Sequence, residues 1–262
     1  MKPISDTWSA WRPWLEERAA EVQASILFLT RIPFARQTPT AATAVAQAAW
    51  AFPVAGLIVG IIGAVIYALA HRLGLPAWPA GALAVAATLA ATGCLHEDGL
   101  ADAADGFGGG ATREQKLDIM RDARTGVFGV SVLVLSILIR VAALASLADT
   151  SLVVPALIAA HGTARATMPI LMFLLPPARG DGLAFAVGRP PGAAVGTGAA
   201  IGFLILAICL GVTPAIVAAV LLAIVTAFVG WLSAREIGGQ SGDVLGALEQ
   251  IGEIAVLLVA VR

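Results

Sequence analysis

Long apolar runs separated by short polar turns dominate this chain. Seven of them approach the roughly 20 residues that a helix needs to cross a bilayer. They cover residues 46–70, 77–96, 126–148, 151–175, 193–211, 213–232 and 243–261. Many are rich in Gly and Ala, which lets helix backbones pack closely in lipid. The pattern predicts an all-α fold: a polytopic transmembrane helical bundle of about seven spans, forming a single membrane domain over residues 1–262.

The N-terminal segment, residues 1–36, has a different pattern. Between residues 5 and 30, Trp8, Trp11 and Leu15 begin a series of apolar side chains at helical intervals, with acidic and basic residues between them. This is typical of an amphipathic helix, and the tryptophans favour a place in the membrane interface. Packing against the cytoplasmic ends of the bundle is the alternative.

The basic residues are distributed unevenly over the turns between the runs. If the N-terminus is inside, the inner segments contain Lys2, Arg12, Arg18, Arg31, Arg36, Arg113, Lys116, Arg121, Arg124, Arg179, Arg189 and Arg235. The outer side holds only Arg72 and Arg262. Because cytoplasmic loops carry the excess of Lys and Arg, we expect a multi-pass protein of the cell inner (cytoplasmic) membrane, in contact with lipid, whose N-terminus and polar loops are cytoplasmic.

Composition supports a membrane protein and excludes one class of partner. Hydrophobic residues make up 59% of the 262 residues and charged residues 13%, about half of the ~25% found in soluble domains. The formal net charge is −1, so no overall positive field attracts nucleic acid.

Five aspartates break this apolar pattern between residues 96 and 125. Asp98, Asp102 and Asp105 follow the spacing i, i+4, i+7, and Asp118 and Asp122 repeat the i, i+4 step. Such residues share a helix face, where like charges repel. A divalent cation explains them, because Mg²⁺ takes carboxylate oxygens as ligands. We predict all five as metal ligands, around two Mg²⁺ ions. A solvated acidic helix balanced by nearby basic residues is the alternative.

The same segment, 96–125, contains our candidate catalytic residues. We expect the helix of the second run to continue directly into it. Two metal ions are the usual clamp for displacement at phosphorus, and Arg121 and Arg124 can bind a diphosphate by forked hydrogen bonds. Asp105, Asp122 and Arg124 are the predicted catalytic residues, with Asp122 either the remaining metal ligand or the general base. For Arg113 and Lys116, ordinary positive-inside anchoring is equally plausible.

Polar residues also occur inside the apolar runs. His161 and Arg165 stand one helical turn apart, where charge is costly and therefore indicates function. Arg140, near the outer end of its run, can simply snorkel to the membrane surface.

The last polar turn is rich in glycine. The loop 238–243 can wrap a phosphate, or it can supply Ser241 or Asp243 as an ordinary helix N-cap. Glu249 and Glu253, further along, indicate a polar cavity within the bundle.

Several strings spread along the chain together resemble the adenosylcobinamide-GDP ribazoletransferase (cobalamin 5′-phosphate synthase) family. The strings are FLTRIP at 28–33, HEDGLADAADG at 96–106, DARTGVFG at 122–129 and GQSGDVLGA at 239–247, with Pro53, Gly56 and Gly60 between the first two. Ala123 and Ser241 depart from the family's usual Ser and Thr, but neither change removes a carboxylate.

The resemblance implies a Mg²⁺-dependent transfer, a late step of cobalamin biosynthesis. The partners that it implies are adenosylcobinamide-GDP and α-ribazole or α-ribazole 5′-phosphate, with GMP released. A homo-oligomer and other corrinoid-pathway enzymes are further candidate partners. With the motifs above, the predicted substrate-binding residues are Arg31, Arg121, His161, Arg165 and Asp243.

Two other functions compete with this interpretation. The aspartate spacing is also similar to that of the CDP-alcohol phosphotransferases, which act on lipid acceptors. The arginine that those enzymes carry soon after the glycine is missing, since Gly109 and Gly110 stand there. An ion-coupled transporter is the second alternative, but transporters place such acids at the bilayer midplane within inverted repeats, and the sequence shows no repeat.

Overall fold

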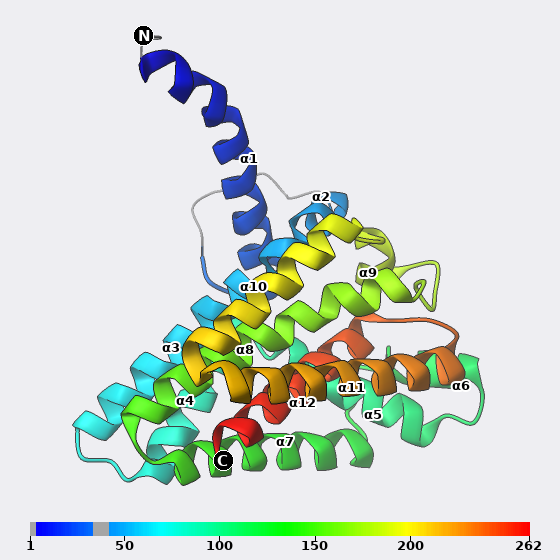
Figure 1. Ribbon diagram of the computed structural model, residues 1–262. Coiled ribbons are helices and arrows are strands. Elements are labelled where there is room, and N and C mark those ends of the chain that lie inside the picture. Colours follow the sequence, from blue (N-terminus) through cyan, green and yellow to red (C-terminus); the bar gives the residue numbers. More distant parts are fainter. Residues whose placement is uncertain (1–3, 34–41) are drawn as a thin grey trace.

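The computed structural model describes residues 4–33 and 42–262, with side chains from residue 11 onward, and within these ranges it contains helices and no strand. The all-α prediction is therefore confirmed (Figure 1). The helices are α1 (Ile4–Leu29), α2 (Ala42–Gln47), the 3-10 helix η1 (Ala48–Ala51), α3 (Phe52–Arg72), α4 (Ala77–Thr92), α5 (Leu95–Gly109), α6 (Arg113–Ile119), α7 (Val127–Leu147), α8 (Thr150–Leu174), α9 (Gly182–Val187), α10 (Gly192–Leu210), α11 (Val212–Ile237) and α12 (Gly242–Ala260). Lys2 and Arg36 of the expected charge pattern lie outside the described residues.

The number of membrane-spanning helices is five or six among the described residues, close to the predicted seven. The five that are long and apolar enough are Ala42–Arg72, Val127–Leu147, Thr150–Leu174, Gly192–Leu210 and Val212–Ile237. The pair α4 and α5 counts as a sixth only if it is one bent span. The last predicted span forms α12, whose Asp243, Glu249 and Glu253 make it a polar central helix instead.

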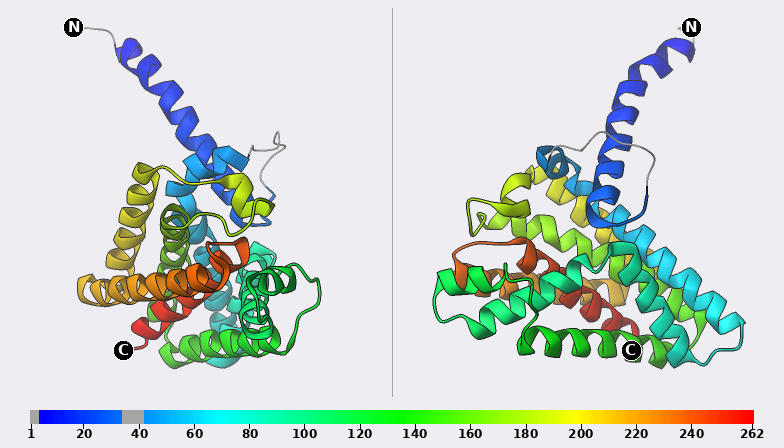
Figure 2. Two further views of the ribbon diagram at one scale, coloured as in Figure 1. Left: turned by 90° about the vertical axis from the view of Figure 1, so that its right-hand side faces the viewer. Right: turned by 180° about the vertical axis from the view of Figure 1, so that it is seen from behind.

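Helix α8 forms the centre of the bundle, and α7, α10 and α11 lie outside it. In the most apolar stretch of α8, 78% of residues are buried, against 17% in α10. Large apolar side chains such as Val134, Ile208 and Ile224 are exposed on the outer helices, as expected for surfaces that face lipid. Figure 2 shows α10 and α11 on one flank, with α12 running behind α11.

Helix α3 packs directly on the backbone of α8 through two glycines. A Cβ at Gly56 would overlap the carbonyl oxygen of His161, and one at Gly60 would lie 2.7 Å from that of Leu157. Small residues four apart are the usual means of such close contact between membrane helices. This packing sets the position of the helix that carries His161.

The acidic segment is not a continuation of the second predicted span, contrary to our expectation. The chain turns by 90° between α4 and α5, because Gly93 and Cys94 both adopt left-handed backbone angles, with φ of 64° and 59°. Two such residues in succession end a helix. Helix α5 therefore leaves the direction of α4 and carries the aspartates across the end of the bundle, outside the five spanning helices.

The N-terminal helix is packed on the bundle only at its end. Ser25 donates a hydrogen bond of 2.8 Å to the carbonyl of Ala48, and the Trp50 indole donates one of 2.6 Å to Glu21. The preceding turns extend away from the body (Figures 1 and 2), with Trp11 and Trp14 more than half exposed. The packing alternative thus holds for the last part of α1, and its interfacial location stays a prediction.

Candidate active site

A pocket opens at the end of the bundle where α5, α8, α9 and α12 meet. Its volume is about 890 Å³ including the open mouth. Helices α5 and α12 form one wall, and they approach closely because both have glycine at the contact. A Cβ at Gly99 would lie 3.0 Å from the carbonyl oxygen of Asp243, and one at Gly246 would lie 3.1 Å from that of His96. This contact brings the acidic face of α5 to the first turn of α12.

Three carboxylates lie along this wall: Asp98 and Asp102 from α5 and Asp243 from α12. Their oxygens do not all lie within 4.8 Å of one another, a spacing that among the described residues only His161, Glu249 and Glu253 reach. Asp98 and Asp243 line the pocket. Asp102, half-buried beside them, has its pKa raised to about 7, chiefly by burial and then by the charges of Asp98, Asp243 and Asp105. A carboxylate whose strongest charged neighbours are all negative lies in an uncompensated acidic environment. Oxygen donors in such a group fit a hard divalent cation.

Asp105, a predicted metal ligand and catalytic residue, uses both carboxylate oxygens in structural hydrogen bonds. One of its carboxylate oxygens accepts a 2.6 Å hydrogen bond from the backbone N–H of Gly126, and the other a 2.9 Å bond from that of Gly129. The side chain is buried. Both bonds satisfy N–H groups at the start of α7, where a helix has unpaired donors and favours negative charge. Asp105 therefore ties α5 to α7.

Asp118 and Asp122 do not join the other aspartates, contrary to our prediction. Asp118 is exposed on α6, and its carboxylate makes no hydrogen bond or ion pair with the described residues. Asp122 forms a forked ion pair with Arg124, with Nη2 to Oδ2 at 2.6 Å. These bonds lower the pKa of Asp122 to about 2. A carboxylate so acidic is a poor general base, and Arg124 is occupied by the same pair outside the pocket.

The wall opposite α5 is a pair of crossed loops, 176–179 and 238–241. The sequence analysis identified only the second, as the glycine-rich turn. The backbone N–H of Ala178 donates to the carbonyl of Gln240 at 2.7 Å, and that of Gln240 donates to the carbonyl of Pro176 at 2.8 Å. The Arg113 guanidinium adds hydrogen bonds to the carbonyls of Ala178 and Ile237. Arg113 thus anchors a loop rather than the membrane surface.

These crossed loops present Arg179 to the pocket. Its Nη2 lies 3.4 Å from Asp243 Oδ2, and Asp181 follows at the rim. Arg121, a predicted substrate-binding residue, reaches the rim only through an ion pair with Asp181. The available signal for Arg179 was an arginine two residues after the Pro-Pro turn that ends the fourth predicted span.

The glycine-rich loop before α12 supplies the N-cap of that helix, which was the simpler of its two interpretations. Ser241 is the N-cap, because its hydroxyl accepts a 3.3 Å hydrogen bond from the backbone N–H of Val244. The same hydroxyl donates to Asp243 at 3.1 Å. Asp243, which we predicted to bind substrate, is oriented toward the pocket by this bond and by Arg179.

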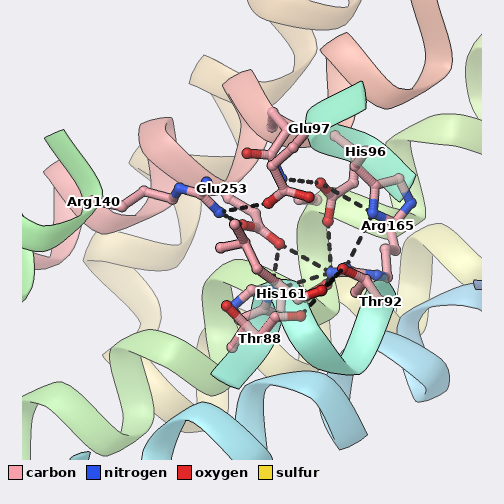
Figure 3. A network of polar contacts seen from close by, with 12 residues as sticks. Thr88, Thr92, His96, Glu97, Arg140, His161, Arg165 and Glu253 are labelled. Atoms are coloured by element: carbon pink, nitrogen blue, oxygen red, sulfur yellow. Dashed lines mark hydrogen bonds and ion pairs between the residues drawn. The ribbon is translucent and has the colours of Figure 1, made fainter. Parts of the chain in front are cut away.

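His161 and Arg165 are in a buried ion network instead of the pocket (Figure 3). Arg165 Nη1 lies 2.6 Å from Glu249 Oε1 and 3.0 Å from Glu253 Oε1. His161 pairs with Glu253. Neither His161 nor Arg165 lines the pocket, and both are at least 95% buried, so their predicted contact with substrate is not supported.

The network also connects α5 and α7 to α8 and α12. Arg140 Nη1 lies 3.1 Å from Glu97 and 3.3 Å from Glu253. Arg140 is 2% exposed, so the expectation that it snorkels is wrong. The polar interior indicated by Glu249 and Glu253 is confirmed. Three carboxylates, those of Glu97, Glu249 and Glu253, face two guanidinium groups, those of Arg140 and Arg165.

Within this network, His161, Glu249 and Glu253 bring one ligand atom each within 4.8 Å of the others, as a metal site requires. The Arg165 guanidinium already bridges the two carboxylates. Since it supplies positive charge where a cation would bind, the group is better described as an ion-pair network.

Arg31, the remaining predicted substrate-binding residue, lies at the bend between α4 and α5. Its backbone N–H donates a 2.7 Å hydrogen bond to the carbonyl of Ala91, and a Cβ at Gly93 would lie 2.6 Å from its Cγ. Arg31 supports the bend and does not line the pocket.

Comparison with known proteins now adds to this geometry. The family model described as cobalamin-5-phosphate synthase (CobS) matches residues 21–261. The chain belongs to the cobalamin-5-phosphate synthase family. The bend, the aspartates, the crossed loops and the buried network all lie within the matched residues.

Curated relatives of this family resemble the chain over almost their full length. A protein of Bradyrhizobium diazoefficiens is 51% identical over 92% of this chain and 93% of its own length. A protein of Mesorhizobium japonicum is 49% identical over 92% of both chains, and one of Azorhizobium caulinodans is 45% identical over 91% and 94%. Each is named adenosylcobinamide-GDP ribazoletransferase.

No solved structure matches the chain. Membership of the cobalamin-5-phosphate synthase family confirms the resemblance found in the sequence. It also removes the support for the two competing interpretations, a CDP-alcohol phosphotransferase and an ion-coupled transporter.

Proposed function

We propose that this protein is an enzyme that transfers the adenosylcobinamide phosphate group from adenosylcobinamide-GDP to α-ribazole or α-ribazole 5′-phosphate, releasing GMP. The proposal is supported by 51% identity, over 92% of this chain, to a relative named adenosylcobinamide-GDP ribazoletransferase. The observation in the structure that carries it is the group of Asp98, Asp102 and Asp243 at the wall of an open pocket.

The reaction is a displacement at phosphorus. A ribose hydroxyl of the acceptor attacks the phosphorus that bears the cobinamide arm, and a new P–O bond forms. The bond from that phosphorus to the bridging oxygen breaks, GMP leaves with its electron pair, and the proton of the attacking hydroxyl passes to the surrounding water. The protein has to hold both substrates in line and to balance the charge of the diphosphate.

Asp98, Asp102 and Asp243 are the residues that would hold Mg²⁺. When bound, the ion supplies positive charge to the diphosphate and to the leaving phosphate. Asp102 fits this use, since the charges that act on it come from other acids, while among the described residues Asp243 is balanced only by Arg179 at 3.4 Å. Our prediction of two ions depended on Asp105, Asp118 and Asp122, which have other surroundings, so we propose a single cation-binding group.

We propose that the pocket faces the cytoplasm. Arg31, Arg113, Arg121 and Arg179 all lie on the segments around this end of the bundle, and the turn between α3 and α4 at the other end follows Arg72. Positive-inside orientation then gives a cytoplasmic N-terminus in the inner membrane.

The transfer assay tests the proposal. Purified protein in detergent is given adenosylcobinamide-GDP with and without each ribazole form, in Mg²⁺ and in EDTA, and GMP and corrinoid product are measured. We expect GMP release only when acceptor and Mg²⁺ are both present. Absence of GMP release in the complete mixture would contradict the proposed function.

Two variants distinguish the proposed cation ligands from acidic residues outside the pocket. Asp102→Asn should lower turnover by about a hundredfold or more, since even outer-shell partners of a metal are worth about 10–100-fold. Glu114→Gln, an exposed acid on α6, is the control and should keep the wild-type rate. Equal rates for the two variants would remove Asp102 from the site.

A further inference from the structure

The floor of the pocket is apolar and suits a flat ring. It is lined by Phe28, Phe52, Met168, Met172, Leu183 and Phe185. The rings of Phe28 and Phe52 are stacked with centroids 5.9 Å apart, and methionine adapts its shape to aromatic partners. A pocket with an apolar floor and a few polar groups at its mouth is the usual form of a small-molecule site.

Arg179 is the basic residue at this mouth, and much of its bonding capacity is unused. Its ion-pair distances are long, 3.4 Å to Asp243 and 3.9 Å to Asp181. Its Nη1 has no hydrogen-bond partner among the described residues. An arginine presents five N–H donors in a rigid fork, so this side chain can still accept an anion with little rearrangement.

The position of Arg179 is fixed by its backbone. The neighbouring Ala178 is held by Gln240 on one side and by Arg113 on the other. Among the described residues that line the pocket, Arg179 is the only arginine or lysine, whereas Asp98, Asp181 and Asp243 are acidic. An anionic substrate that enters next to these acids therefore has one guanidinium available to it from the pocket wall.

We propose that Arg179 binds a phosphate of a nucleoside phosphate whose base occupies the apolar floor of the pocket. This inference rests on the proposed function, in which two molecules have that chemistry. One is an acceptor that carries a 5′-phosphate, and the other is the GDP part of the donor. In both, a planar base and a phosphate are joined by a ribose, which matches an apolar floor below a cationic rim.

The test is the kinetics of Arg179→Gln in the full-length protein, with α-ribazole and α-ribazole 5′-phosphate as separate acceptors. We expect the KM of the phosphate-bearing ligand of Arg179 to rise by about tenfold or more, because hydrogen bonds to charged groups are the strong ones. If that ligand is the acceptor, only the KM of α-ribazole 5′-phosphate rises. If it is the donor, the KM of adenosylcobinamide-GDP rises with either acceptor.

Two further variants complete the experiment. Arg235→Gln removes an arginine that is 65% exposed at the end of α11 and should leave every KM unchanged. If Arg179→Gln does not fold, Arg179→Lys replaces it. A lysine keeps the charge but not the fork, so the same KM should rise several-fold.

The outcomes distinguish this inference from the proposed function. Wild-type protein without transfer activity contradicts the proposed function itself. Active wild-type protein whose Arg179→Gln variant keeps all KM values within twofold overturns the role of Arg179 alone. Calorimetric binding of α-ribazole 5′-phosphate and of GMP to both proteins gives the same comparison without turnover, with weaker binding expected for Arg179→Gln.

Discussion

At the scale of single residues, the neighbours of each carboxylate determine what it can do. Asp102 is surrounded by acids and has a raised pKa, whereas Asp122 is held by Arg124 and has a lowered one. Both carboxylate oxygens of Asp105 accept hydrogen bonds from backbone N–H groups. Within residues 102–122, one aspartate is thus a candidate cation ligand, another caps a helix, and a third is an ion-pair partner.

The capping role of Asp105 predicts a loss of stability in Asp105→Asn. An amide has one acceptor oxygen, so one of the two bonds to α7 is lost and an N–H group loses its partner. We expect a cost of about 1–3 kcal/mol and a lower Tm in detergent. Asp118→Asn, at an exposed position, is the matched control for stability and should unfold like wild type. Equal Tm values for the two variants would contradict the capping role of Asp105.

At the scale of elements, the site depends on how α5 is placed. The bend at Gly93 and Cys94 directs it across the end of the bundle. The ion network, through Glu97 and Arg140, connects it to α7 and α12. The contact of Gly99 with the first turn of α12 then brings Asp98 and Asp102 toward Asp243.

This arrangement predicts the effect of a single methyl group at the contact. In Gly99→Ala, the new Cβ would lie 3.0 Å from a backbone oxygen of α12, which forces α5 and α12 apart. We expect a lower Tm and a loss of transfer activity of about tenfold or more, because a displacement of about 1 Å can cost a hundredfold in rate.

Gly196→Ala in α10 is the control, since a Cβ there meets nothing within 4 Å. Alanine favours helix over glycine, so this variant should be as stable as wild type or slightly more so. Wild-type activity and Tm in Gly99→Ala would show that the α5–α12 contact does not determine the site.

At the scale of the whole molecule, the sequence was sufficient for the long helices. It was insufficient for the short helices α2 and α9 and for the places where the helices meet. Apolar runs identified each long helix, and helical spacing identified the acidic face of α5. The bend could not be read from the sequence, because Cys94 is not a residue type that marks left-handed backbone. The role of Asp105 depends on partners 21 and 24 residues away, and that of Arg179 on a partner 64 residues away. No local pattern indicates such partners.

The central claim is that Asp98, Asp102 and Asp243 form a cation site, and cation binding measures it most directly. Mn²⁺, which takes the same oxygen ligands as Mg²⁺, is titrated into the purified protein and its free fraction is followed by electron paramagnetic resonance. We expect saturable binding in wild type and in Glu114→Gln, competed by Mg²⁺, and binding weakened by about tenfold or more in Asp102→Asn. Equal Mn²⁺ affinity in all three proteins would contradict the account.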